Sequence, residues 1–180
     1  MKKSLLIGLS VLLVLIFAYI GVRKYTKSFS PGSTAEYNQD GLDILINYSQ
    51  PAKKGRYIFG REQDNALLPY GKVWRTGANE ATVIEFKTAV SFAGKAVAAG
   101  KYSLWTVPDA GSWKVILNSE TGQWGTEYND GKDILKSSIP IRVRPKVQEM
   151  FTIYFEKQTD GVNLILSWDQ TEAIIPIKVK

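Results

Sequence analysis

The sequence contains neither cysteine nor histidine in its 180 residues. Without cysteine there is no disulfide, no thiolate nucleophile and no zinc site of the cysteine type. Without histidine there is no Ser-His-Asp triad, no imidazole base and no histidine-bound transition metal. We therefore predict no metal site and no cofactor. Any chemistry would have to use carboxylates, lysine, tyrosine or serine.

Familiar catalytic motifs are missing as well. The sequence has no phosphate-cradling glycine loop, no nucleophile elbow and no zinc-binding helix motif. Glu127, Asn129, Asp130 and Asp133 gather oxygen ligands in one segment, but their spacing does not follow the EF-hand pattern. We predict a solvated acidic loop there rather than a calcium site.

Acidic residues are absent before Glu36, so the charge of the chain is unevenly distributed. Residues 1–27 hold five basic residues: Lys2, Lys3, Arg23, Lys24 and Lys27. Subtracting these five from the 23 Lys and Arg leaves 18 basic against 17 acidic residues downstream. A phosphate-binding surface needs an excess of Lys and Arg across the domain itself. The charge balance therefore gives no reason to expect nucleic acid as a partner.

Residues 5–22 form one uncharged run of 18 residues. As a helix this run would be about 27 Å long, close to the ~30 Å hydrocarbon core of a bilayer. Arg-Lys-Tyr-Thr-Lys follows it, whereas a cleaved signal peptide ends in a small-x-small site. We predict an uncleaved membrane anchor over residues 1–27, with a cleaved signal as the alternative. The domain is expected outside the cytoplasm, on the periplasmic or cell-envelope side, although basic residues flank both ends of the run.

Beyond a linker of turn-forming residues at 28–34, the pattern over residues 35–180 is that of an all-β domain. Short β-branched and aromatic runs recur about every ten residues, between Gly, Pro, Asn and Asp. The predicted strands are 43–48, 82–87, 90–92, 95–97, 102–107, 113–118, 139–144, 149–156, 162–169 and 172–179. Ala93-Gly94, Asp160-Gly161 and the turn beginning at Asp169 are expected to close hairpins. These features predict an antiparallel β-sandwich or flattened, jelly-roll-like barrel of about nine or ten short strands.

The most unusual segment is 69–86, where a corner at Thr76-Gly77-Ala78 precedes a plain strand. Gly77 and Asn79 are residue types that enter left-handed backbone conformations at least cost. The corner is therefore expected to hold Arg75 and Glu80 in fixed directions. One interpretation is a partly buried ion pair between them that pins the turn. In a second, Arg75 grips a carboxylate or phosphate in bidentate fashion while Glu80 accepts a hydroxyl or acts as a base. In a third, the two form an exposed, inert pair.

Two further segments add candidate ligand contacts. Arg56 follows Gly55 in a basic loop, and Trp124 lies in a polar connection of about 15 residues, 119–133, which is long for a compact domain. The five tryptophans are expected mainly in the core, yet one or two could stack on sugar rings at a rim. The full set of ligand-binding candidates is Arg56, Tyr70, Trp74, Arg75, Asn79, Glu80 and Trp124.

Several strings in this chain resemble one bacterial family. They begin at Lys54 (Lys-Gly-Arg-x-Ile-Phe-Gly), Leu68 (Leu-Pro-Tyr-Gly-Lys-Val-Trp-Arg-Thr-Gly-Ala-Asn-Glu-Ala-Thr), Ala99 (Ala-Gly-Lys-Tyr-Ser-Leu-Trp-Thr-Val-Pro) and Gln123 (Gln-Trp-Gly). The family is catalogued as domain of unknown function 2911, and the resemblance covers about residues 30–178. It implies an exported or envelope β-sandwich protein of Bacteroidetes-like bacteria. It implies no activity.

Two functions from different classes remain open, and a purely structural role is a third alternative. The first is a membrane-anchored, non-catalytic module that binds a glycan, a peptide or a neighbouring envelope protein. The second is a hydrolase of an envelope or extracellular polymer, in which Glu80 would work with Glu127, Asp130 or Asp133 as an acid and base pair. Glycosidase chemistry needs two carboxyl groups roughly 5 to 9.5 Å apart. Glu80 is thus the one candidate catalytic residue.

Overall fold

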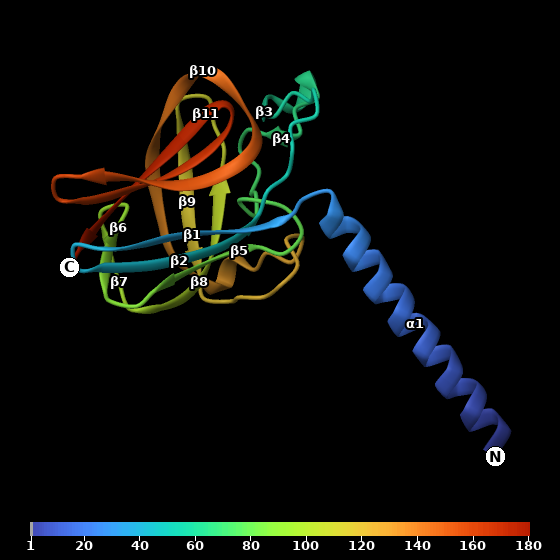
Figure 1. Ribbon diagram of the computed structural model, residues 1–180. Coiled ribbons are helices and arrows are strands. Elements are labelled where there is room, and N and C mark those ends of the chain that lie inside the picture. The colour runs from blue at the N-terminus through green and yellow to red at the C-terminus, as the bar shows by residue number, and fades with distance from the viewer. Residues whose placement is uncertain (1) are drawn as a thin grey trace.

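The computed structural model describes residues 2–180, and side chains from Leu6 onward. The chain begins with α1 (Lys2–Ser28), which extends away from the rest of the molecule as a straight rod (Figure 1). Its apolar side chains are exposed, Phe17 at 70% for example. The part from Leu6 to Ser28 is long and apolar enough to cross a membrane. The expected apolar N-terminal helix is therefore present.

The remainder of the chain consists of strands and the segments that connect them. The strands are β1 (Gly32–Gln39), β2 (Leu42–Ser49), β3 (Phe59–Gly60), β4 (Leu68–Pro69), β5 (Thr82–Phe86), β6 (Val90–Phe92), β7 (Lys95–Val97), β8 (Gly100–Val107), β9 (Ser112–Asn118), β10 (Asp133–Gln158) and β11 (Gly161–Val179). Two short 3-10 helices, η1 (Glu62–Asp64) and η2 (Asp130–Lys132), lie in the connections. Nine strands form one antiparallel sheet in the order β1-β2-β5-β8-β9-β10-β11-β6-β7, and β3 pairs with β4 separately. The predicted all-β antiparallel class is confirmed.

The sheet curls into two layers without closing into a barrel. The long strands β10 and β11 bend sharply and fold over the flatter part of the sheet (Figure 1). Contacts between the layers come from residues far apart in sequence. The backbone N–H of Ile153 donates to the hydroxyl of Tyr48 at 3.1 Å, and the rings of Tyr37 and Phe155 lie 5.4 Å apart. The result is the sandwich-like arrangement that the strand pattern predicts.

The space between the layers is filled by apolar side chains of the strands, and in several strands the buried positions alternate with more exposed ones. In β2, for example, Leu42, Ile44, Ile46 and Tyr48 are buried. At one end of the core an aromatic cluster joins several elements: Phe59, Trp74, Trp113, Phe151 and Trp168. The rings of Trp74 and Trp168 stack with centroids 5.9 Å apart. Each such pair adds about 0.5–1.5 kcal/mol to the free energy of burial.

The structure differs from the predicted strand pattern at its N-terminal edge. β1 begins at Gly32, so part of the expected linker is strand and only residues 29–31 separate it from α1. β1 has no apolar stripe, because only Ala35 and Tyr37 are buried along its length. It is held by its antiparallel pairing with β2, which runs from Gly32 opposite Ser49 to Gln39 opposite Leu42.

The second difference from the predicted strand pattern lies in the C-terminal half of the chain. The predicted hairpin at Asp160-Gly161 is confirmed, since Gln158 pairs with Gly161. The predicted hairpin at Asp169 is wrong, because β11 continues through this residue and pairs with β10 on both sides of it. Asp169 has a left-handed backbone (φ 54) and lies opposite Gln148, where the register shifts. The turn signal at Asp169 therefore marks a β-bulge and not a chain reversal.

Candidate functional site

The corner after β4 is fixed by backbone pairing and by the hydroxyl of Thr82. Trp74 and Thr106 exchange backbone hydrogen bonds of 2.7 and 2.9 Å, and the hydroxyl of Thr82 donates to the Thr76 carbonyl at 2.7 Å. Asn79 has the expected left-handed backbone, with φ 61. Thr76 is also left-handed, with φ 52, which its β-branched side chain opposes. A strained conformation of this kind costs about 1–3 kcal/mol and requires surroundings that enforce it.

Among the side chains that the structure describes, Arg75 has no acidic partner at this corner. It is half-buried, and its buried Nε makes no hydrogen bond. Burial lowers the pKa of its guanidinium from the ordinary value. An arginine nevertheless keeps its proton in a protein, so a positive charge stays in a partly desolvated place. Across residues 2–180 the structure shows no ion pair between Arg75 and Glu80, and the interpretation of the two as a pinning pair is wrong.

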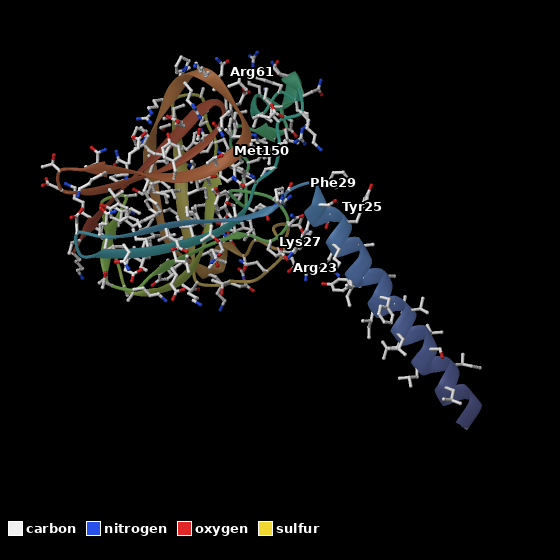
Figure 2. The ribbon with its side chains drawn as sticks, viewed as in Figure 1. Arg23, Tyr25, Lys27, Phe29, Arg61 and Met150 are labelled. Carbon is white, nitrogen blue, oxygen red and sulfur yellow. The ribbon has the colours of Figure 1, made fainter. Side chains whose placement is uncertain are left out.

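Glu80 instead binds the end of α1. Its Oε1 lies 2.9 Å from Nζ of Lys27 and 3.1 Å from Nη2 of Arg23. Burial by itself would raise the pKa of Glu80, but the hydrogen bond from Lys27 and the nearby charges outweigh it and hold that pKa below the ordinary value. Figure 2 shows Arg23 and Lys27 where α1 meets the domain. Glu80 therefore fastens the helix to the sheet.

Arg75 lines a pocket with a volume of about 560 Å³ at this junction. Its lining comes from the helix junction, the chain after β2, the β4 region, the corner, the long loop and β11: Phe29, Ser30, Pro51, Ala52, Lys54, Arg56, Leu67, Leu68, Val73, Trp74, Arg75, Gly77, Ala78, Gly125 and Trp168. Three of these residues are cationic and none is acidic. The volume falls within the ~300–1,000 Å³ range of small-molecule sites.

The other two cations of the pocket also lack a carboxylate partner in the described residues. The guanidinium of Arg56 donates only to the carbonyl oxygens of Ala52 and Lys53. Nζ of Lys54 lies 5.2 Å above the ring of Phe29. The carboxylate of Glu149 accepts from the backbone N–H of Lys54 at 2.7 Å, but it does not line the cavity. Lys54, Arg56 and Arg75 thus give the lining a net positive charge, which suits an anion.

Gly125 is what makes room for Arg75. A Cβ at Gly125 would lie 1.8 Å from Cδ of Arg75 and 2.8 Å from the carbonyl oxygen of Asn79. The backbone N–H of Gly125 donates to that same oxygen at 2.9 Å. The long loop therefore packs directly over the corner, and glycine is required where the arginine side chain crosses it. The sequence holds only a weak signal for this contact, which is the presence of Gly125 in the Gln123-Trp-Gly string that resembles the family.

The predicted ligand contacts divide into two groups. The structure brings Arg56, Trp74 and Arg75 together at the pocket. Tyr70 packs against the core, and the side-chain amide of Asn79 donates to the carbonyl of Ser30 at 3.3 Å. Trp124 lies under the guanidinium of Arg23, 4.8 Å from the ring centroid, outside the pocket lining. Lys54, Phe29 and Trp168 line the pocket but were not predicted, because their approach depends on the fold.

A second charged cluster lies between β10 and β11 and was not predicted from the sequence. Its centre is Glu172, 4% exposed, which pairs with Arg142 and Arg144 and accepts hydrogen bonds from Tyr154 and Ser167. Burial alone would raise the pKa of Glu172, but the Tyr154 and Arg142 hydrogen bonds hold it below the ordinary value. Burial and the same carboxylate raise the pKa of Tyr154 to about 12. Because these groups satisfy one another, we interpret the cluster as structural.

Of the loop carboxylates proposed as partners of Glu80, one, Asp133, is bound to other residues. Asp133 accepts hydrogen bonds from Asn118 and Tyr128 and pairs with Lys136 at 2.9 Å. Burial, followed by the bond to Asp133, raises the pKa of the Tyr128 hydroxyl. The side chain of Asn129 accepts from the backbone of Gly131 and caps η2. None of the loop carboxylates lines the pocket beside Arg75.

Comparison with known proteins gives one match. The family model described as "Protein of unknown function (DUF2911)" matches residues 30–177, which is most of the chain and begins just after α1. No curated protein and no solved structure matches.

Proposed function

The chain belongs to the DUF2911 family of proteins of unknown function, and we propose that it is a membrane-anchored, non-catalytic binding protein whose pocket accepts a ligand with an anionic group. The observation that carries this proposal is Arg75, a half-buried cation without an acidic partner in a pocket of about 560 Å³. Desolvating a charge without compensation is costly, and a bound anion would supply the missing partner. Among glycans, peptides and envelope partners, acidic ones are thus favoured.

The anchor is proposed from the exposure of α1. Its apolar side chains have no protein surface to cover them, and a helix of this length that is hydrophobic on all sides is stable within a bilayer. We propose that α1 stays attached and that the sheet domain lies outside the cytoplasm. The ion pairs of Glu80 with Arg23 and Lys27 support retention, since removal of α1 would leave this carboxylate without its partners.

Binding without catalysis is proposed from the composition of the pocket. Its lining contains no carboxylate, and Glu80 faces the end of α1 instead. A hydrolase that relies on two carboxyl groups would need both beside the ligand. The cations of the pocket provide charge and hydrogen-bond donors for holding an anion.

Binding is tested with ligands offered in acidic and neutral pairs to the full chain in an uncharged detergent. Hexuronate and glucose oligosaccharides form one pair, acidic and neutral peptides a second, and alkyl phosphate and alkyl glucoside a third. We expect at least one acidic member to bind tenfold or more tightly than its neutral partner, and Arg75→Met to abolish that preference. Equal binding throughout each pair, or an unchanged preference in Arg75→Met, would overturn the proposal.

Membrane topology is tested by labelling a single introduced cysteine, because the natural chain has none. Ala98 is exposed between β7 and β8, remote from the pocket lining. An Ala98→Cys variant expressed in bacteria should react with a membrane-impermeant maleimide in spheroplasts before lysis. It should also stay in the membrane fraction at its full length. Labelling only after lysis, or a shortened soluble product, would contradict the anchored, exported arrangement.

A further inference from the structure

The position of the pocket relative to α1 identifies where its ligand comes from. The uncharged run ends at Val22, and α1 continues as a helix for six more residues, 23–28, a rise of about 9 Å. The headgroup layer on one side of a bilayer is about 5–8 Å thick. Phe29, the first residue after α1, already lines the pocket. If α1 spans the membrane, the pocket lies at the surface of the headgroup layer.

Exposed apolar and aromatic residues surround this end of the molecule. Tyr25 and Phe29 make an edge-to-face contact 4.9 Å apart and are 67% and 49% exposed. Leu67 and Val73 of the pocket lining are exposed too. Figure 2 shows Tyr25 and Phe29 at the junction, and β3 and β4 lie on the same side of the domain in Figure 1. Aromatic residues beside basic ones are typical of a protein surface that meets lipid headgroups.

The chemistry of the lining matches one component of that layer. A phosphate diester suits the planar fork of Arg75, and Lys54 and Arg56 add positive charge at the rim. Phe29, Leu67 and Val73, which are 49%, 40% and 43% exposed, offer apolar surface to the glycerol and first acyl carbons. A zwitterionic headgroup would bring a second cation towards Lys54 and Arg56, which repel it. An uncharged or net-positive headgroup is therefore disfavoured.

We infer that the pocket binds the headgroup of an anionic phospholipid from the membrane that α1 enters. This inference rests on the proposed function and adds to it the class and source of the anion. The lipid phosphate would neutralise the charge of Arg75 and, together with α1, hold the domain against the bilayer surface. Arg23, Lys24 and Lys27 at the end of α1 would attract the same lipids.

The test measures lipid bound to the full chain in uncharged maltoside detergent, by native mass spectrometry and by thermal shift. The probes are dihexanoyl phosphatidylglycerol, dihexanoyl phosphatidylcholine, glycerol 1-phosphate and an acidic peptide. We expect one phosphatidylglycerol to bind at least tenfold more tightly than the other three. Phosphatidylcholine lacks the net charge, glycerol phosphate lacks the apolar part, and the peptide lacks both the phosphate and the acyl carbons.

Four variants locate the binding. Arg75→Met should weaken phosphatidylglycerol binding at least tenfold. Lys54→Met and Arg56→Met, at exposed positions, should each weaken it several-fold, which keeps the test valid if Arg75→Met unfolds. Lys114→Met removes an exposed cation of β9 outside the pocket and should leave binding unchanged.

The outcomes separate the inference from the function on which it rests. Equal binding of glycerol phosphate and phosphatidylglycerol, or tighter binding of the acidic peptide, would overturn the lipid assignment while leaving an anion-binding pocket. Equal binding of the two phospholipids would also overturn it. If Lys114→Met weakens lipid binding as much as Lys54→Met, the attraction is diffuse and the pocket is not the site. If no anion binds, both proposals fail.

Discussion

The carboxylate of Glu80 lies 2.9 Å from Nζ of Lys27, across the junction between α1 and the sheet. Arg23 binds the same carboxylate oxygen and also stacks on Trp124 of the long loop. The last turns of α1 are thus attached both to the corner and to the loop. Because the side chains of Arg23 and Lys27 are 36% and 52% exposed, each ion pair contributes only about 0–1 kcal/mol to stability. Their main consequence is to orient the helix beside the pocket.

The first prediction concerns the absence of coupling between Arg75 and Glu80. In a double-mutant cycle of Arg75→Met and Glu80→Gln, the changes in unfolding free energy should add within about 0.5 kcal/mol, as for residues without a shared contact. Thermal or denaturant unfolding of the four proteins in detergent measures this. As a positive control, the cycle of Lys27→Met and Glu80→Gln should show the larger coupling. A coupling above about 1 kcal/mol for Arg75 and Glu80 would mean that the two side chains pair after all.

The pairing of Glu80 shows what the sequence around the corner does and does not determine. Asn79 signals its left-handed backbone through residue type alone, and the structure bears that out. Of the two partners of Glu80, Arg23 lies 57 residues earlier in the chain, and Lys27 belongs to the same helix. No local pattern predicts such a contact, because it depends on where α1 leaves the domain. Arg75 and Glu80 are close in sequence, which suggested that they form a pair, but in the fold they do not pair.

The strands also divide into those that local sequence predicts and those that depend on tertiary pairing. β2, β5, β8 and β9 were predictable because buried apolar side chains give each of them a readable pattern. β1 was missed because its sequence is polar and its pairing with β2 supplies the order. In β10 the polar stretch before Gln148 looks like a break between two strands, although it is a bulge within one. Bulges and polar edge strands are decided by tertiary pairing, and local propensity carries little information about them.

The second prediction is that Gly125→Ala damages the pocket through Arg75. The added Cβ would collide with Cδ of Arg75 and press on the carbonyl oxygen of Asn79. Overpacking of this kind costs about 1–3 kcal/mol. Chemical unfolding should show this loss in Gly125→Ala, and anion binding should fall with it. The exposed Gly111, where a Cβ meets nothing, provides the control, so Gly111→Ala should be nearly neutral.

The same contact can be tested by rescue. Arg75→Ala removes the atom that collides first, but the oxygen of Asn79 remains 2.8 Å from the new Cβ. Gly125→Ala should therefore be less costly in the Arg75→Ala background than in the natural one, without becoming neutral. An equal cost in both backgrounds would show that the arginine does not cross this glycine.

The third prediction links stability at low pH to Glu172. Its pKa is lower in the folded protein than the ordinary value of 4.5, because Tyr154 and Arg142 bind the charged form. The stabilisation is therefore complete above the unfolded pKa and is lost as pH falls through the folded pKa. Unfolding free energy should decline below about pH 5, and Glu172→Gln should remove part of that decline.

At neutral pH, Glu172→Gln should cost about 1.5–3 kcal/mol, because it removes the charged acceptor of the hydrogen bonds from Arg142 and Tyr154, while the partly exposed Arg142 keeps its pair with Glu156. Denaturant unfolding between pH 3 and pH 7 measures both effects. Glu127→Gln, at an exposed loop position, is the matched control and should leave the pH profile unchanged. A Glu172→Gln profile parallel to that of the natural protein would place the acid sensitivity elsewhere.

The last prediction sets stability against binding at Arg75. If this cation is kept for a ligand, its removal relieves a desolvation cost that nothing in the free protein offsets. In the absence of ligand, Arg75→Met should leave the unfolding free energy unchanged or raise it by up to about 1 kcal/mol, since the methionine can pack against the apolar lining. Anion binding should be lost in the same variant. Thermal unfolding with and without a saturating anionic ligand measures both, because a ligand stabilises only the protein that binds it. An Arg75→Met variant several kcal/mol less stable than the natural protein, with ligand binding intact, would make Arg75 a structural residue, and the pocket would then depend on Lys54 and Arg56 alone.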